Sequence, residues 1–183
     1  MARVLIPLAQ GCEELEAVTL IDLLRRADIE VVTAGLDDRP VTASRGTVLQ
    51  PDADLDTALA EAFDMVALPG GLPGAENLDQ DPRIRALLKQ MQQAGKFVCA
   101  ICAAPMVLAG AGLLEGKRAT AYPGLLEKAG VSGVTVTGAA VERDGTIITS
   151  RGPGTAMDFA LTLIEALTDR GTRDRVEAAL VRV

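Results

Sequence analysis

The sequence predicts an α/β fold in which helices cover both faces of a mostly parallel sheet. Short apolar runs such as Phe97–Ile101 are typical of strands buried on both faces of a parallel sheet. Longer segments of helix-forming residues alternate with these runs, and glycine and proline mark the junctions. The 183 residues, of which 49% are hydrophobic, suit a single domain spanning residues 1–183.

The N-terminal half is predicted to hold three strands of this sheet. Arg3–Ala9 is an apolar run and predicts the first strand. Glu13–Ala27 is predicted to be a helix, because acidic residues in its opening turns and Arg25 and Arg26 in its last turn complement the helix dipole. Turn residues separate a strand, a hairpin, a short helix, a buried strand, one helical turn and a proline-initiated helix: Ile29–Leu36, Val41–Gln50, Asp54–Ala62, Phe63–Leu68, Gly74–Leu78 and Pro82–Ala94.

The C-terminal half continues the alternation. The strand Phe97–Ile101 leads into a predicted helix over Ala103–Ala111, where Pro105 is tolerated in the first turn. The loop Ser150–Thr155 enters a long amphipathic helix that ends near Leu167. The other expected elements are a strand, a short helix, a further strand, a hairpin and a last helix: Arg118–Ala121, Gly124–Ala129, Val134–Thr137, Val141–Arg143 with Thr146–Thr149, and Arg173–Leu180.

Cys102 lies where the strand changes into the helix. Unpaired N–H groups and the helix dipole at such a junction favour negative charge, so we expect the site to lower the pKa of the thiol and to make Cys102 a nucleophile. The alternative is that Cys102 is a small buried hydrophobic residue, as free cysteines often are. The local sequence leaves both interpretations open.

Other cysteine-based sites fit the sequence poorly. Cys99 and Cys102 form a C-x-x-C pattern, but three residues of strand separate their Cα atoms by roughly 10 Å, beyond the roughly 7 Å limit of a disulfide. Cys12 is the third cysteine, and an odd number without a secretory signal indicates reduced thiols and a cytoplasmic protein. The uncharged segment Phe97–Leu114 is interrupted by Pro105 and lacks basic and aromatic flanks, so no membrane span is predicted.

Composition excludes several classes of function. The net charge of -7 and an aromatic content of 2% argue against nucleic-acid binding through a basic surface. The sequence contains no histidine, which excludes Ser-His and Cys-His catalysis and imidazole metal ligation. A carboxyl, a lysine, Tyr122 or water must therefore carry any catalytic proton.

Two further features belong to the same sheet edge as Cys102. Gly70 and Gly71 follow a buried strand, where they form either an anion-binding nest of N–H groups or a tight turn. The first strand-to-helix segment carries a group of glutamates whose periodicity does not show which one turns inward: Glu13, Glu14 and Glu16.

Four motifs, found in order along nearly the whole chain, carry a family resemblance. They are Gly11–Val18 (GCEELEAV), Leu68–Gly71 (LPGG), Ala100–Pro105 (AICAAP) and Thr149–Thr155 (TSRGPGT). Together they resemble the ThiJ/PfpI superfamily, and within it the branch of the parkinsonism-associated protein deglycase and bacterial YajL. The resemblance implies a flavodoxin-like three-layer sandwich, a homodimer and a reactive cysteine at the junction.

The resemblance also implies roles for individual residues. Glu16 matches a protonated carboxyl that hydrogen-bonds the Cys102 sulfur. The family residues whose N–H groups face this sulfur correspond to Gly70, Gly71 and Ala103. Arg45, which pattern alone places in a solvated loop, matches an arginine that reaches the site of the other subunit. Asp22 and Arg26 match polar residues of that dimer interface.

Two residues depart from the family pattern or extend it. Tyr122 stands where some relatives have a histidine near the cysteine, which weakens amidotransferase and protease interpretations and leaves Glu16 or water to move protons. Cys12 is either a resolving thiol for Cys102 or a packed small residue.

The function that the resemblance implies is enzymatic and needs no cofactor and no metal. Cys102 and Glu16 are expected to act as a deglycase or glyoxalase on methylglyoxal, glyoxal and early glycation adducts of amines and thiols, releasing lactate or glycolate and protecting against carbonyl and oxidative stress. The alternative is a non-enzymatic chaperone that senses oxidation when Cys102 becomes a sulfinic acid.

Overall fold

The computed structural model describes residues 1–182, and a seven-stranded sheet forms its centre. The strand order is β10-β11-β7-β6-β1-β2-β5, and all neighbours are parallel except β10 and β11. The strands in chain order are β1 Arg3–Leu8, β2 Glu30–Gly35, β5 Ala53–Asp54, β6 Met65–Leu68, β7 Phe97–Ile101, β10 Val141–Asp144 and β11 Ile147–Ser150. The expected mostly parallel sheet is confirmed.

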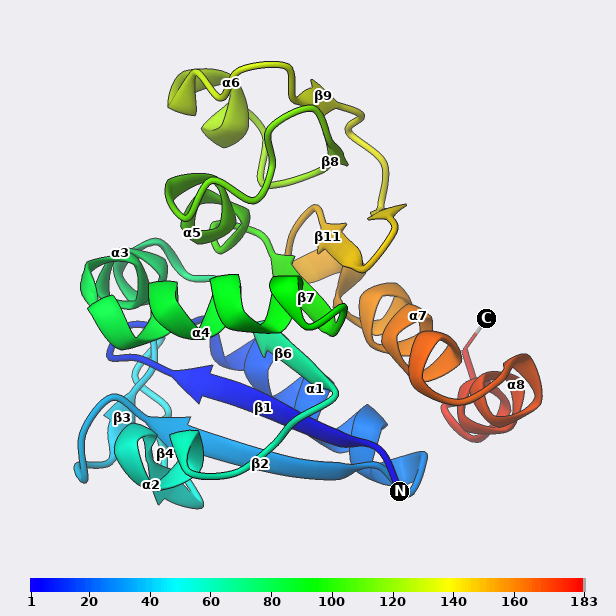
Figure 1. The fold of residues 1–183 in the computed structure, drawn as a ribbon. Helices are drawn as coiled ribbons and strands as arrows, with labels where there is room; N and C mark the ends of the chain where they lie inside the picture. The colour runs from blue at the N-terminus through cyan, green and yellow to red at the C-terminus, as the bar shows by residue number, and fades with distance from the viewer. Residues whose placement is uncertain (183) are drawn as a thin grey trace.

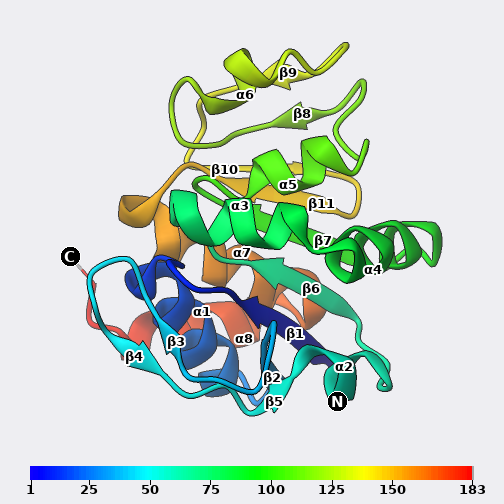
Figure 2. The ribbon, with the colours of Figure 1, turned by 90° about the vertical axis from the view of Figure 1, so that its left-hand side faces the viewer.

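Helices cover both faces of the sheet, which gives the expected three layers (Figures 1 and 2). One face carries α1 (Glu14–Arg26) packed against α7 (Ala156–Leu167), with α8 (Arg170–Ala179) beside α7. The opposite face carries α2 Leu55–Leu59, α3 Leu72–Gln80, α4 Pro82–Gln93 and α5 Pro105–Gly110. No helix within residues 1–182 has both the length and the apolar character that crossing a membrane requires.

Short elements extend the molecule at two places. The antiparallel pair β3 (Val41–Thr42) and β4 (Val48–Leu49) forms the predicted hairpin. The second pair is parallel and lies beyond α5 together with a short helix (Figure 1): β8 Arg118–Ala119, β9 Thr135–Val136 and α6 Leu125–Ala129.

The core consists of two apolar clusters, one on each face of the sheet. Successive side chains of a strand point to opposite faces, so Leu5 belongs to one cluster and Ile6 to the other, and both are fully buried. Phe159 of α7 belongs to the cluster of Ile6, and Leu88 of α4 belongs to the cluster of Leu5. A strand that is buried on both sides needs an uninterrupted apolar run, which explains the pattern in the sequence.

Some boundaries differ from the predictions. The single turn expected at Gly74–Leu78 is the nine-residue helix α3, because Pro73 lies in its first turn, where a proline does not break a helix. The helix expected over Ala103–Ala111 begins later, at Pro105. The last helix begins at Arg170 and not at Arg173, because Asp169 caps it by accepting a hydrogen bond from the Thr172 N–H.

Candidate functional site

Cys102 lies at a sharp turn between β7 and α5. Its φ angle is +64°, in the left-handed region, which costs roughly 1–2 kcal/mol for a residue with a Cβ atom. The Cys102 N–H donates to the Ser150 carbonyl at 3.0 Å, and the Tyr122 N–H donates to the Cys102 carbonyl at 2.9 Å. Both polar main-chain groups of Cys102 are thus held by other segments, which fixes the direction of its side chain.

Glu16 is the glutamate of the first βα segment that turns inward. Its side chain is fully buried in the first turns of α1, and the Gly70 N–H donates to its Oε2 atom at 2.8 Å. The other carboxyl oxygen, Oε1, is buried and accepts no bond from a nitrogen or oxygen donor within residues 1–182. A buried carboxyl with a single N–H donor favours its protonated form.

Gly70 allows Glu16 and Cys102 to approach each other. A Cβ atom at position 70 would lie 2.7 Å from Cys102 Cβ and 2.7 Å from Glu16 Oε2. Both groups therefore lie against the same point in space, and only glycine leaves this point empty. The carboxyl and the sulfur-bearing side chain approach each other across this glycine, and the resemblance described above predicts this arrangement.

Burial dominates the electrostatics of the pair. It raises the pKa of Glu16 to about 7, while the Gly70 N–H and the Cys102 side chain act in the opposite direction. Burial and the adjacent Glu16 carboxylate raise the pKa of the Cys102 thiol to about 12, against the lowering effect of N–H groups from Gly71 and Ala103. The expectation of a lowered thiol pKa is therefore wrong for this structure. The dipole of α5 adds little, because the helix has six residues and begins at Pro105.

A coupled pair of this kind provides a nucleophile and a base together. Near neutral pH Glu16 exchanges its proton readily, and two groups in contact release their protons as one system. When Glu16 is ionised it can accept the thiol proton of Cys102 during attack on an electrophile. The Gly71 and Ala103 N–H groups then stabilise the charge on sulfur.

The structure corrects one expected detail of the glycine turn. The resemblance places the N–H groups of Gly70 and Gly71 both at the sulfur, but the Gly70 N–H is used by Glu16. Gly71 has a φ angle of +83°, and its N–H acts on Cys102 together with that of Ala103. The turn therefore divides its donors between the carboxyl and the thiol.

The other two glutamates organise the hairpin. The Glu14 carboxylate accepts hydrogen bonds from the Arg45 N–H at 3.0 Å and from the Ser44 hydroxyl at 3.0 Å. Desolvation acts to raise the pKa of Glu14, but these and other donors lower it to about 2. Glu13 caps α1 and also accepts from Ser44. Glu13 therefore acts at the start of α1, and Glu14 attaches the hairpin to this helix.

The expected interface residues lie apart from the pair. Arg45 is exposed at the hairpin tip between β3 and β4. Asp22 and Arg26 form an ion pair of 2.7 Å on α1. No hydrogen bond or ion pair connects these three residues to Cys102 or Glu16 among the residues described.

Tyr122 lies beside the site. Within residues 1–182, its side chain forms no hydrogen bond with Cys102 or Glu16. Its side chain is 53% exposed, and its ring lies 3.6 Å from where a Gly152 Cβ atom would be. Together with Arg151 and Pro153 it lines a shallow hollow of about 260 Å³.

Cys12 is fully buried, and burial followed by the charge of Glu14 raises its pKa to about 11. It belongs to the same apolar cluster as Cys102, and all three cysteines are free thiols. The structure thus places Cys12 as a packed residue, and a resolving role stays a prediction.

Ser150 and Thr155 support the site and were not predicted individually. Ser150 is fully buried, its carbonyl holds the Cys102 N–H, and its hydroxyl lies 2.7 Å from the Thr155 hydroxyl. Thr155 in turn bonds to Gly152. The motif Thr149–Thr155 was the available signal, but its pattern indicated only a helix entry. Residues 1–182 contain no cluster of three or more potential metal ligands of the His, Cys, Asp or Glu type.

The chain is similar to known proteins over nearly its whole length. Residues 2–166 match the DJ-1/PfpI family. The chain is 40% identical to the Parkinson disease protein 7 homolog of Danio rerio, over 98% of this chain and 96% of that protein. It is 35% identical to the glutathione-independent glyoxalase DJR-1.2 of Caenorhabditis elegans, over 91% of this chain and 88% of that protein. The crystal structure of Drosophila melanogaster DJ-1beta matches with a TM-score of 0.95 and 38% identity, covering 100% of this chain and 98% of that chain.

Not every relative has the same length. Protein DJ-1 homolog A of Arabidopsis thaliana is 41% identical over 97% of this chain, but the chain spans only 46% of that relative. The family match covers most of the residues and includes all the motifs described above. The chain therefore belongs to the DJ-1/PfpI family.

Proposed function

We propose that this protein is a cofactor-independent glyoxalase and deglycase that acts on small dicarbonyl compounds and on their early adducts with amines and thiols. The observation that carries the proposal is the buried pair Glu16 and Cys102, in which the carboxyl has a pKa of about 7. A base with a pKa near the working pH is well suited to proton transfer. The name of the C. elegans relative, a glutathione-independent glyoxalase, supports the glyoxalase part of the proposal.

In the proposed reaction with methylglyoxal, Glu16 accepts the thiol proton while the Cys102 sulfur bonds to the aldehyde carbon. Protonation of the aldehyde oxygen by Glu16 gives a hemithioacetal. Glu16 then removes the hydrogen from this carbon as a proton and returns it to the neighbouring carbon. The hydroxyl proton of the hemithioacetal passes to the neighbouring oxygen, which yields a thioester of lactate. Water hydrolyses the thioester, releases lactate and restores the thiol, so the net reaction adds one water to methylglyoxal. In a glycation adduct, the amine or thiol on the attacked carbon is the group that leaves.

The N–H groups of Gly71 and Ala103 supply the electrostatic part of the proposed mechanism. They act on the Cys102 sulfur and so lie where negative charge develops. Removing one such donor in other enzymes costs on the order of 10² in rate. Gly70 contributes indirectly, because its N–H orients Glu16.

We also propose that the protein works as a homodimer through the face that contains Arg45. Three large apolar side chains are exposed on α1 and on the adjacent hairpin, at 51%, 46% and 63%: Leu15, Val18 and Val48. Glu14 ties the hairpin to α1, so these side chains form one surface. Burying this surface in a second copy would bring Arg45 into the interface.

Lactate formation from methylglyoxal by freshly reduced protein tests the proposal. The assay is done in a buffer without amines or thiols, since these react with methylglyoxal themselves. We expect Cys102→Ser to abolish lactate formation, because a hydroxyl is a far weaker nucleophile beside the same base. Retention of most of the activity would refute the role of the thiol. Cys12→Ser serves as the matched control and should retain activity.

A second candidate function is supported by the same N–H groups, because donors at the sulfur would also stabilise a sulfinate. In that case the protein is an oxidation sensor and chaperone. Glu16→Gln separates the two: a catalyst loses turnover, whereas a sensor changes mainly the oxidation product of Cys102. Lactate assays and mass spectrometry after peroxide treatment measure the two effects on the same sample.

A further inference from the structure

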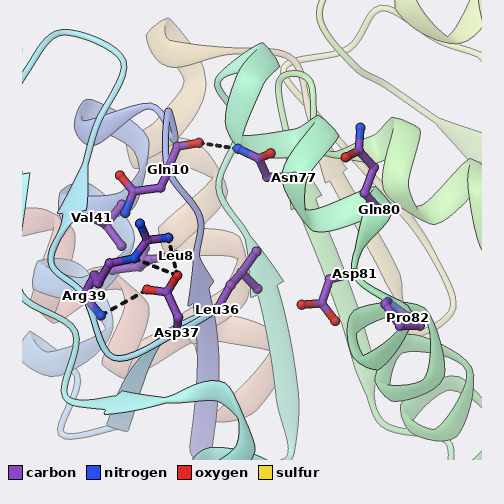
Figure 3. A pocket seen from close by; sticks show the side chains of 10 residues that line it. All are labelled: Leu8, Gln10, Leu36, Asp37, Arg39, Val41, Asn77, Gln80, Asp81 and Pro82. Atoms are coloured by element: carbon purple, nitrogen blue, oxygen red, sulfur yellow. Dashed lines mark hydrogen bonds and ion pairs between the residues drawn. The ribbon is translucent and has the colours of Figure 1, made fainter.

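A second hollow lies at the carboxyl edge of the sheet, apart from the Glu16 and Cys102 pair. Its volume is about 470 Å³, within the range of small-molecule sites. Leu8 and Leu36 border it at the ends of β1 and β2, and α3 and the start of α4 form its other side (Figure 3). Ligands of parallel α/β folds bind outside the carboxyl ends of the strands, which is where this hollow lies.

The lining has an apolar part and a polar rim. Leu36 is half-buried and supplies the apolar part, and the almost fully buried Leu8 and Val41 lie beneath it. Figure 3 shows Asp37 and Arg39 on one side and Gln80 and Asp81 on the other. The Asn77 side chain donates to the Gln10 carbonyl at 2.9 Å and so connects the two sides. None of the ten lining residues contributes to the site around Cys102.

The charges of this rim are already paired. Arg39 donates from Nε to Asp37 Oδ2 at 3.0 Å and from Nη2 at 2.5 Å. Arg83 donates in the same way to Asp81, from Nε at 3.0 Å and from Nη2 at 2.6 Å. These contacts hold the pKa of Asp37 and of Asp81 below the usual range, so both carboxylates are ionised and neutralised. A charged ligand would meet no unpaired charge of opposite sign here.

The rim nevertheless keeps hydrogen-bonding capacity for a ligand. Asp37 occupies the Nε and Nη2 atoms of Arg39, and Gln80 is exposed at the rim. Carboxylate oxygens have more lone pairs than their present contacts use. The hollow therefore offers donors and acceptors around an apolar surface, and a hydroxyl group is both a donor and an acceptor.

We propose that this hollow binds an uncharged, hydroxyl-rich molecule of about the size of a monosaccharide. Paired charges select against anions and cations, and the mixed donors and acceptors select for hydroxyl groups. Such a ligand would contact Gln80 and Arg39 through hydrogen bonds and would cover the exposed part of Leu36 with its carbon skeleton. The proposal does not depend on the chemistry of Cys102.

Three sugars with one scaffold test the proposal: methyl α-D-glucopyranoside, its 6-phosphate and its 2-amino-2-deoxy analogue. The methyl group removes the free carbonyl, so none of them reacts with the Cys102 thiol. We expect the neutral glycoside to shift the backbone amide signals of Leu36, Asn77 and Gln80 in two-dimensional NMR spectra of the full chain. The charged analogues should bind at least threefold more weakly. Equal or tighter binding of a charged analogue, or no shift at the highest soluble concentration, would overturn the proposal.

Variants locate the contact. Gln80→Ala should raise the Kd of the neutral glycoside by roughly three- to tenfold, the equivalent of one lost neutral hydrogen bond. Gln93→Ala changes an exposed glutamine of α4 outside the hollow and should leave the Kd unchanged. Arg39→Gln leaves Asp37 without its cation and should shift the preference toward the amino sugar. An unchanged Kd for Gln80→Ala together with unchanged selectivity for Arg39→Gln would place the ligand elsewhere and overturn the proposal.

Discussion

The Gly70 N–H donates to the Glu16 carboxyl at 2.8 Å, and this contact orients the base that lies beside the proposed nucleophile. The same glycine leaves the space through which carboxyl and thiol meet. A substitution of Gly70 therefore affects both the hydrogen bond to Glu16 and the space between Glu16 and Cys102.

Gly70→Ala should destabilise the protein and reduce its activity. The added Cβ atom would lie 2.7 Å from Cys102 Cβ and 2.8 Å from the Ile101 carbonyl oxygen, and the main chain of β7 cannot move away cheaply. We expect a loss of about 1–3 kcal/mol in the free energy of unfolding, typical of overpacking. Urea unfolding measures the loss. Gly154→Ala is the control, because nothing lies within 4 Å of its Cβ position; equal effects of the two variants would contradict the steric argument.

The contribution of Glu16 to the free energy of unfolding should decrease as the pH rises, which is opposite to the usual behaviour of a carboxyl group. Its pKa is raised from 4.5 to about 7 in the folded protein, so folding favours the protonated form. This contribution is fully present below about pH 4.5 and is lost as the pH rises through 7, amounting to roughly 3 kcal/mol in all.

Glu16→Gln removes this contribution, so its stability relative to the unchanged protein should improve as the pH rises from 4.5 to 7. Denaturant unfolding at several pH values measures the difference. Glu76→Gln, at an exposed glutamate of α3, should run parallel to the unchanged protein. A Glu16→Gln curve that also runs parallel would show that Glu16 is not buried as described.

The turn at Cys102 should be relieved by glycine. A Cβ atom at a φ angle of +64° is strained, and glycine removes the strain. Both Cys102→Gly and Cys102→Ala lose the thiol, so their comparison isolates the backbone effect. We expect Cys102→Gly to be more stable than Cys102→Ala by about 1 kcal/mol. Thermal unfolding of the two variants decides this, and a less stable glycine variant would argue against the left-handed conformation.

The rate of lactate formation should follow the ionisation of Glu16. Below pH 7 the rate is expected to fall about tenfold for each pH unit, because the base is lost, and near pH 7 it should level off. A pH profile of kcat/KM on reduced protein provides the measurement. A profile that instead keeps rising to pH 9 would show that ionisation of a free thiol controls the reaction.

Association should depend on the exposed apolar surface around Arg45. Val18→Asp places a charge in this surface, and we expect it to convert a dimer into a monomer in size-exclusion chromatography with light scattering. Val181→Asp changes a residue that is 83% exposed at the C-terminal end of the chain and should leave the mass unchanged. A monomeric unchanged protein would remove the basis of the dimer proposal.

The sequence predicts the fold well where burial determines the pattern. Phe97–Ile101 is a strand with the expected bounds, because both of its faces are buried and its residues must be apolar throughout. The sequence predicts one turn where α3 has nine residues, because glycine and proline disfavour helices in general but not in the first turn. Helix propensity alone does not show that these residues lie in a first turn, because the first residue of the helix must be known for that.

The site was predictable in its position but not in its electrostatics. The junction after β7 identifies Cys102, and the family resemblance selects Glu16 from three glutamates. The pKa of a thiol depends on how many atoms exclude water from it, which no local pattern gives. The division of donors between Gly70 and Gly71 likewise depends on the path of α1, a segment distant in the sequence.

The strained turn at position 102 is held by main-chain atoms of Ser150 and Tyr122, and not by the sulfur itself. The scaffold therefore presents whatever small group occupies this position at the same spot. A selenocysteine installed there would take the same position, and its lower intrinsic pKa would make formation of the nucleophile independent of the neighbouring carboxyl. The position of the reactive atom is therefore set by the main chain and not by the chemistry of the side chain.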